Sequence, residues 1–258
     1  MRSSEELIRE SQATDSGRAP HSFDPRQESS LLVVMPHPDD ESFSSGGTMA
    51  LCAKAGATVT YLCGTYGDMG RRMGIPPVAN RESLRDIRER ELREAAGVLG
   101  FGVTFMGLRD KCVEFEDPDL VAASIREEIE RLAPSTLITY YPGYGVHPDH
   151  DSLGQAAVIA VRDTPRDRRP RLLAVPVGDP EELQKKLGAP HVETRISSVS
   201  ELKLEALRAH RSQTAQMFRQ WQEGELDPQM ERMRRQMVEV ERFYELDPDQ
   251  LTPMELSA

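Results

Sequence analysis

The sequence predicts a single α/β domain with a Rossmann-like, doubly wound and mostly parallel sheet, together with long C-terminal helices. Short apolar runs that suit strands buried on both faces alternate with longer amphipathic segments that suit helices. This alternation is typical of a parallel sheet covered by helices. The chain has 258 residues, a length that suits one domain with one hydrophobic core.

Five continuous apolar or β-branched runs predict the main strands, and a shorter run predicts a sixth. Strands one to five are expected over residues 31–35, 58–63, 103–106, 136–140 and 172–177, and the sixth near residues 192–196. In the usual order 3-2-1-4-5, strands one and four are neighbours at the point where the strand order reverses. Ligands of such sheets bind there, at the carboxyl ends of the strands.

Amphipathic segments with capping residues predict the helices between these strands. The helices are expected over residues 46–55, 81–99, 118–132, 152–161 and 201–222. Asn80 is the expected N-cap of the second helix, and Asp151 or Ser152 that of the fourth.

The two ends of the chain are set apart from the expected domain, which spans residues 31–222. Residues 1–30 are polar and aperiodic, so a disordered or loosely docked tail is expected there. Residues 223–258 are expected to form a helical extension, with a helix over residues 227–246. Apolar residues at heptad-like spacing predict that it packs on the domain or on a neighbouring subunit, so we expect a homo-oligomer. This apolar stripe comprises Met230, Met233, Met237, Val240 and Tyr244.

The composition restricts the partners and the compartment. A net charge of −11 argues against nucleic acid or an anionic membrane as a partner and favours a small molecule. No apolar run reaches the length of a membrane span, and the first residues contain no apolar signal segment. Cys52, Cys63 and Cys112 are scattered and odd in number, which is typical of reduced thiols. We therefore expect a cytoplasmic protein.

Chemically active side chains are concentrated directly after the first strand, in the sequence PHPDDE at residues 36–41. Pro36 and Pro38 fix the backbone and remove two donors, so this turn cannot continue as a helix. The side chains of His37 and Asp40 are then expected to converge on one point, while Asp39 faces an adjacent one.

A second cluster, HPDH at residues 147–150, follows the fourth strand. Because strands one and four are expected to be neighbours, the two clusters should meet at one edge of the sheet. Two imidazoles and one carboxylate with an open position form a common catalytic zinc set, so His37, Asp40 and His150 are the expected ligands. The same set also accepts ferrous iron.

The other polar residues of the clusters predict acid–base chemistry beside the metal. Zinc lowers the pKa of its bound water to roughly 7, and Asp39 is placed to take the proton of that water. As an imidazolium, His147 would stabilise an oxyanion and protonate a leaving amine, and Asp149 would hold its tautomer. Glu41 is expected in a structural ion pair. For either cluster alone, a buried, hydrogen-bonded structural histidine is the alternative interpretation.

These motifs resemble the two signatures of the LmbE-like, or PIG-L, family of zinc-dependent N-acetylglucosamine deacetylases. The resemblance spans residues 31–214 and includes ANRE at 79–82 and AHRSQT at 209–214. The segments GTYGDMGRRMG, DK and EFED are similar in particular to bacillithiol-biosynthesis deacetylases, which remove acetyl from N-acetylglucosaminyl-malate. The resemblance implies the ligands, base and acid assigned above. It also implies a tyrosine before HPDH that polarises the carbonyl, for which Tyr144 is the candidate and Tyr141 lies nearby.

Four cations and one histidine are the candidates for substrate binding. Arg71 or Arg72, on the glycine-rich loop after the second strand, can pair with the sugar or with the carboxylates of malate. Arg109 and Lys111 follow the third strand at the same edge of the sheet. For each of these cations, a solvated surface position is the alternative. His210 either binds substrate or packs the long helix against the pocket.

The sequence therefore predicts a metal-dependent hydrolase that removes the N-acetyl group of N-acetylglucosaminyl-malate, a small amino-sugar substrate. Among metal hydrolases, the alternatives are deacetylation of another N-acetylglucosamine conjugate and cleavage of a thiol-conjugate amide. Outside enzymes, the alternative is a metal-binding or sugar-binding module without turnover. Asp39 separates these classes, because a binding module needs the ligands but no additional carboxylate.

Overall fold

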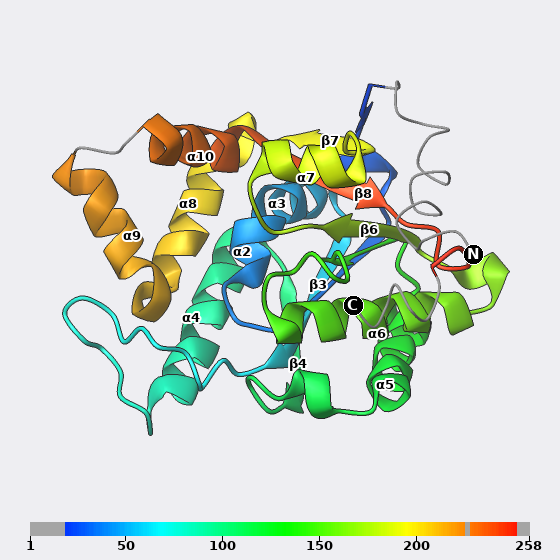
Figure 1. The fold of residues 1–258 in the computed structure, drawn as a ribbon, viewed down its shortest axis with the longest axis horizontal. Coiled ribbons are helices and arrows are strands. Elements are labelled where there is room, and N and C mark those ends of the chain that lie inside the picture. The colour runs from blue at the N-terminus through cyan, green and yellow to red at the C-terminus, as the bar shows by residue number, and fades with distance from the viewer. Residues whose placement is uncertain (1–18, 225–227, 252–258) are drawn as a thin grey trace.

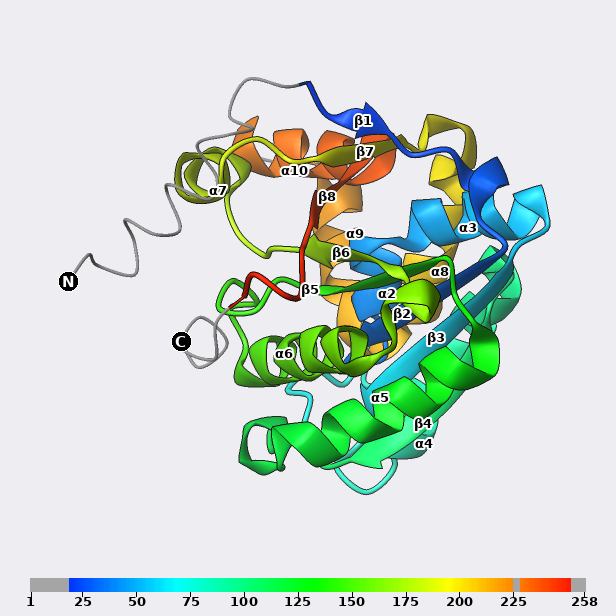
Figure 2. The same cartoon turned by 90° about the vertical axis from the view of Figure 1, so that its right-hand side faces the viewer.

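The structure is a computed structural model that describes residues 19–224 and 228–251. Its centre is one mixed sheet with helices on both faces (Figures 1 and 2). Within the described residues the strand order is β1-β7-β8-β6-β5-β2-β3-β4, and β8 alone runs antiparallel to its neighbours. The strands are β1 (His21–Ser22), β2 (Ser30–Met35), β3 (Thr58–Thr65), β4 (Gly102–Leu108), β5 (Thr136–Tyr140), β6 (Arg171–Val175), β7 (Val192–Arg195) and β8 (Val240–Glu245).

Two layers of helices enclose the sheet. The helices are α2 (Asp40–Ser44), α3 (Gly46–Ala55), α4 (Leu84–Leu99), α5 (Pro118–Leu132), α6 (Pro148–Asp163), α7 (Pro180–Leu187), α8 (Ser200–Ala209), α9 (Arg211–Glu223) and α10 (Pro228–Glu239). Helices α3, α4 and α8 share one apolar core with the sheet, through residues such as Met49, Leu92 and Ala206. Helices α5 and α6 form a second core on the other face, through Ile125 and Ala157 (Figure 2).

The predicted α/β class and the order of the five main strands are confirmed. β4, β3, β2, β5 and β6 lie side by side in the expected order 3-2-1-4-5. β2 is buried along its whole length and pairs in parallel with both β3 and β5. The carboxyl ends of β2 and β5 are therefore neighbours, and each of the two His/Asp clusters follows one of them.

Two helices begin at positions other than those expected. Helix α4 begins after Ser83, because Asn80 caps a turn in front of it, with its Oδ1 accepting a bond from Ser83 N at 2.9 Å. Helix α6 begins at Pro148, with His147 in the N-cap position. The HPDH motif thus forms the first turn of a helix instead of a loop before one.

The single helix expected over residues 201–222 is wrong, because the structure divides it into α8 and α9. The division lies at His210, whose ψ of 49° leaves the helical region. The His210 ring is fully buried, and its Nε2 lies 2.9 Å from the Glu41 carboxylate. The chain therefore bends at the residue that makes this buried contact.

The helix expected up to residue 246 is also wrong in its last part. Helix α10 ends at Glu239, and residues 240–245 form β8, which inserts between β6 and β7. Val240 and Tyr244 of the expected apolar stripe therefore lie in a strand, and the side chains of Met230 and Met233 lie outside the described residues. The stripe consequently gives no support for self-association.

Glu241 provides the physical reason for the position of β8. Its carboxylate accepts bonds from Gly47 N and Thr48 N, at 2.8 and 2.7 Å, and so caps the start of α3. It also lies 2.6 Å from Lys203 Nζ on α8, and both side chains are buried. The negative charge of Glu241 is therefore stabilised both by the N-terminus of α3 and by the buried Lys203 ammonium group.

Part of the expected N-terminal tail lies against the sheet. β1 pairs in parallel with β7, and Phe23 belongs to one apolar core. Residues 1–18 of the expected tail lie outside the described residues, and the division of the chain into tail, domain and extension stays a prediction. In the described part of the chain, no helix has both the length and the apolar character needed to cross a membrane.

Candidate metal centre and active site

The two His/Asp clusters meet beyond the carboxyl ends of β2 and β5. His37 Nδ1 lies 3.3 Å from Asp40 Oδ2 and 3.3 Å from His150 Nε2, and His150 Nε2 lies 3.5 Å from Asp40 Oδ1. Ligand atoms on a tetrahedral metal with bonds of about 2.0–2.1 Å stand about 3.3 Å apart. The three side chains therefore fit one divalent cation that keeps a further position open.

The electrostatics of this set also suit a cation. Burial lowers the pKa of His37, but the carboxylates of Asp110, Asp149 and Asp40 raise it well above its usual value. Burial raises the pKa of Asp40, but His150 and His37 hold it well below its usual value. The site thus favours positive charge at the point where the three ligand atoms meet.

Both imidazoles are oriented through their other nitrogen. His37 Nε2 lies 3.1 Å from Asp149 Oδ2 and 3.3 Å from Asp110 Oδ1. His150 Nδ1 lies 2.9 Å from the carbonyl oxygen of Gly145, to which it donates. Each ring therefore presents its remaining nitrogen to Asp40, as metal-binding histidines do when a hydrogen bond fixes their tautomer.

Gly145 and Tyr140 complete this arrangement. A Cβ atom at Gly145 would lie 2.5 Å from the Cβ of His150, so only glycine lets the loop approach the imidazole this closely. Tyr140, the last residue of β5, donates its hydroxyl to Asp40 Oδ1 at 2.9 Å. Its ring stacks on His150 with the centroids 4.1 Å apart. Tyr140 thus holds Asp40 and His150 at once.

Asp149 has a different partner from the one expected. Its carboxylate accepts bonds from the backbone of Lys111 and Val113, at 2.8 and 3.2 Å, and its contact with an imidazole is with His37. His147 interacts with the backbone of Asp149 instead, since its Nδ1 accepts the Asp149 N–H at 3.1 Å. Asp149 therefore orients His37, and the Nε2 of His147 is left to carry the proton.

His147 and Tyr144 lie at the wall of a hollow of about 440 Å³ beside the ligands. The His147 ring centroid is 5.1 Å from that of His37. Burial and the nearby His37 lower the pKa of His147. Tyr144 packs edge to face against Tyr141, with the ring centroids 5.3 Å apart. The two residues expected to act on the carbonyl thus face one space.

Asp39 does not belong to the group formed by His37, Asp40 and His150. Its φ of 108° falls in the left-handed region, where a residue with a side chain is strained, and such strain persists where the surroundings impose it. Its N–H donates to Glu41 Oε2 at 3.0 Å, and its Oδ2 lies 3.2 Å from Arg88 Nη2. Burial raises the pKa of Asp39 to about 6, and the charge of Arg88 opposes this rise.

The expected substrate-binding residues fall into two groups. Arg71, Arg72, Arg109 and Lys111 are exposed, and Arg72 Nη1 donates to the backbone of the chain at the start of α9. His210 is fully buried against Glu41, so it has no surface to offer a substrate. The structure therefore favours the packing alternative for His210, and it confirms the structural pair expected for Glu41.

Three residues of the site were not singled out from the sequence. The sequence carried a signal for Asp110 and Tyr140, because Tyr140 is the last residue of a predicted strand and Asp110 lies in the loop that follows another. Arg88 carries no such signal. It lies in the middle of α4 among other charged residues, and only the fold shows that it is buried and donates to Gly67 O at 2.8 Å and to the carbonyl of Pro38.

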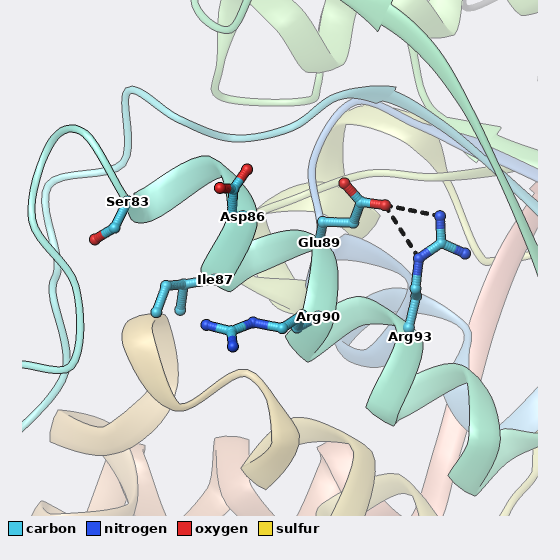
Figure 3. Close-up of a pocket in the computed structure, with 6 residues that line it drawn as sticks. All are labelled: Ser83, Asp86, Ile87, Glu89, Arg90 and Arg93. Carbon is cyan, nitrogen blue, oxygen red and sulfur yellow. Dashed lines mark hydrogen bonds and ion pairs between the residues drawn. The ribbon is translucent and has the colours of Figure 1, made fainter.

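A second hollow, of about 420 Å³, lies along the outer side of α4 (Figure 3). Glu89 and Arg93 form an exposed ion pair of 2.7 Å at its edge. Residues of α4 and its N-cap line it, and they include no residue of the two clusters. We assign no chemistry to it.

Comparison with known proteins gives the family. The family model PIG-L, described as GlcNAc-PI de-N-acetylase, matches residues 32–161, which include both clusters. A Bacillus cereus protein named probable N-acetyl-alpha-D-glucosaminyl L-malate deacetylase 2 is 47% identical over 189 residues, which are 73% of this chain and 85% of the relative. A Bacillus anthracis protein of the same name is 43% identical over 204 residues, 77% of this chain and 89% of the relative.

A solved structure shares the fold. N,N'-diacetylchitobiose deacetylase from Pyrococcus horikoshii superimposes with a TM-score of 0.69 at 21% identity, and the match covers 98% of this chain and 97% of that one. The family resemblance carried by PHPDDE and HPDH is therefore confirmed: the chain belongs to the PIG-L family.

Proposed function

We propose that this chain is a metal-dependent N-deacetylase that hydrolyses the acetamide of N-acetyl-α-D-glucosaminyl L-malate to a free amine and acetate. The names of the two Bacillus relatives support the substrate. The observation that carries the proposal is that His37, Asp40 and His150 close on one point while the carboxylate of Asp39 is held outside that set by Arg88.

The metal we propose is zinc. Two imidazoles and one carboxylate suit Zn²⁺, although ferrous iron also accepts such a set. His37, Asp40 and His150 would hold the cation through the nitrogen and oxygen atoms that face one another. When bound, it would supply Lewis-acid chemistry, which activates water and polarises a carbonyl oxygen.

Asp39 is the proposed base. Its Oδ2 lies against Arg88, whereas its Oδ1 has no hydrogen-bond partner among the described residues, so Oδ1 accepts the proton of the attacking water. The same atom then returns the proton to the nitrogen as the C–N bond breaks. A positioned carboxylate of this kind contributes a rate factor of about 10²–10⁴.

His147 is the proposed oxyanion stabiliser. Because the Asp149 N–H occupies its Nδ1, the Nε2–H remains as a donor for the negative charge that develops on the carbonyl oxygen. Tyr144 lines the same hollow and is our candidate for a second donor to that oxygen. His147 can act in this way as a neutral imidazole, whereas the sequence suggested an imidazolium.

The test is acetate release from a panel of substrates. Protein loaded with Zn²⁺, or with Fe²⁺ without oxygen, is incubated with N-acetylglucosaminyl-malate, an N-acetylglucosaminyl inositol, diacetylchitobiose and free N-acetylglucosamine. We expect the malate conjugate to give acetate and free amine in equal amounts and with the highest kcat/KM. A chelator should abolish the reaction, and added metal should restore it. Release from none of these substrates would contradict the proposal.

We also propose a cytoplasmic location and self-association. Cys52, Cys63 and Cys112 are free thiols, which supports a reducing compartment. Phe115 and Leu120 leave large apolar side chains exposed, which supports contact between copies of the chain. Light scattering of the metal-loaded protein tests this second point, and a mass equal to one chain would contradict it.

A further inference from the structure

We propose that the hollow beside His147 is the subsite for the anionic malate group and that Lys186 is the residue that selects this group. The inference rests on the proposed function and adds to it a specificity-determining residue. It follows from what lines the hollow, from the partners of the charged residues there, and from the chemistry of the substrate.

The hollow joins the catalytic residues to helix α7. Tyr144 and His147 belong to the loop that leads from β5 into α6, and they form one wall. Asp179, Glu182 and Lys186, at the start and along α7, also line the hollow. A ligand in this space therefore contacts the proposed oxyanion stabiliser and α7 together.

The substrate places its anionic group in this neighbourhood. In an N-acetylglucosaminyl conjugate the acetamide is on C2 of the sugar, and the conjugated group is attached to C1, the adjacent carbon. Because C1 and C2 are adjacent, the malate lies next to the acetamide on the sugar ring, so a carbonyl at His147 places the malate close to His147 as well. His147 lines the hollow and its ring centroid lies 5.1 Å from that of His37, so the hollow meets this requirement.

The carboxylates that line the hollow are already engaged. Asp151 Oδ1 accepts the N–H of Gly145 at 2.7 Å. Asp179 Oδ1 accepts two backbone N–H groups in the first turn of α7, at 3.0 and 3.1 Å. Glu182 Oε1 lies 2.6 Å from Lys185 Nζ. Each negative charge thus has a donor, which reduces the repulsion that an anionic ligand would meet.

Lys186 has no such partner. It is exposed and lines the hollow, and it makes no hydrogen bond or ion pair with any residue in the described part of the chain. Lys185, its neighbour on α7, is paired with Glu182. Lys186 is consequently the cation on this wall that is free to receive a carboxylate, and its long, flexible stem lets the ammonium group reach into the hollow.

The test compares two ligands that are not hydrolysed. Glucosaminyl L-malate, which is the deacetylated product, and methyl α-glucosaminide are titrated calorimetrically into metal-loaded protein. The variants are Lys186→Met, Lys186→Arg and, as a control for net charge, Lys54→Met, which removes an exposed lysine that does not line the hollow. The quantity compared is the ratio of the two dissociation constants.

We expect the wild type to prefer the malate ligand, and Lys186→Met to lower this preference about fivefold to tenfold, as the loss of one partly screened ion contact implies. Lys186→Arg should restore most of the preference, and Lys54→Met should keep it. An unchanged preference in Lys186→Met would overturn the inference.

Acetate release, measured in parallel, separates this inference from the proposed function. Binding of the malate ligand that depends on Lys186, without acetate release by the wild type, would contradict the proposed function and leave the subsite supported. Acetate release from the malate conjugate with the same KM in the wild type and in Lys186→Met would overturn the subsite alone.

Discussion

The Arg88 guanidinium lies 3.2 Å from the Asp39 carboxylate, and this contact joins α4 to the strained residue that directly precedes Asp40 in the chain. The Arg88 side chain is buried, and it also donates to the carbonyl groups of Gly67 and Pro38. A buried cation bonded to two loops and to the proposed base fixes the direction of that base.

Arg88→Met should lower kcat without releasing the metal. The Asp39 carboxylate would lose the contact that orients it, and misplacement of a reacting group by about 1 Å costs roughly 100-fold in rate, whereas the three ligands keep their own contacts. Arg90→Met, on the same helix but exposed at the hollow of Figure 3, is the control and should keep the wild-type rate. The measurements are kcat for acetate release and metal content. Wild-type kcat in Arg88→Met would remove this contact from the mechanism.

Tyr140→Phe should weaken metal binding. The variant loses the hydroxyl bond to Asp40 and keeps the ring that stacks on His150, and loss of a group that orients a ligand typically costs 10–100-fold in metal affinity. Tyr244→Phe loses a comparable bond, from its hydroxyl to Gly188 O at 3.0 Å, outside the site. Competition with a metal-binding dye should show weaker binding for the first variant and wild-type binding for the second. Equal affinities would refute the role of Tyr140.

His210 should make stability depend on pH. Burial lowers its pKa, but Glu41, and to a smaller extent the charge of Asp39, raise it above the usual value of 6.5, and its Nδ1 has no hydrogen-bond partner in the described part of the chain. A raised folded-state pKa adds stability that is complete below pH 6.5 and is lost as the pH rises through the raised value. Urea unfolding of the wild type and His210→Gln from about pH 5.5 to about pH 9 should therefore show the largest difference at low pH. A difference that does not change with pH would contradict this.

Glu241→Gln should destabilise the fold. It leaves Lys203 buried without its counter-charge and weakens the cap of α3, and breaking a buried pair in this way costs about 3–5 kcal/mol. Glu182→Gln makes the same chemical change in the exposed pair with Lys185 and should leave the free energy of unfolding nearly unchanged. Thermal and urea unfolding compare the two variants. Similar stabilities would show that the Glu241 pair contributes little.

The main sheet could be predicted from the sequence, because strands buried on both faces are continuous apolar runs that need no partner to be recognised. β8 could not, since its residues are mostly polar and its position depends on Glu241 reaching the start of α3, 194 residues away along the chain. The break at His210 has the same cause. The amphipathic pattern continues through it, and only the distant Glu41 makes a bend there favourable.

The candidate site could likewise be predicted from the sequence only in part. The convergence of His37, Asp40 and His150 was predictable because two motifs with histidine and aspartate follow strands that the topology makes neighbours. The partner of Asp149 was not, because adjacent residues in the HPDH sequence suggested a pair with His147, whereas the first turn of α6 directs the carboxylate to His37. In the sequence, nothing distinguishes Arg88 from its charged neighbours on α4. Only the fold shows that it is buried.

The most direct test of the account compares Asp39→Asn with Asp40→Asn, two neighbouring carboxylates that receive the same chemical change. Metal content after dialysis and acetate release are measured for both. We predict that Asp40→Asn loses the metal and the activity together, whereas Asp39→Asn retains the metal and loses a factor of about 10²–10⁴ in rate. Loss of metal from Asp39→Asn to the same extent as from Asp40→Asn, or a wild-type rate in Asp39→Asn, would contradict the division between ligand and base.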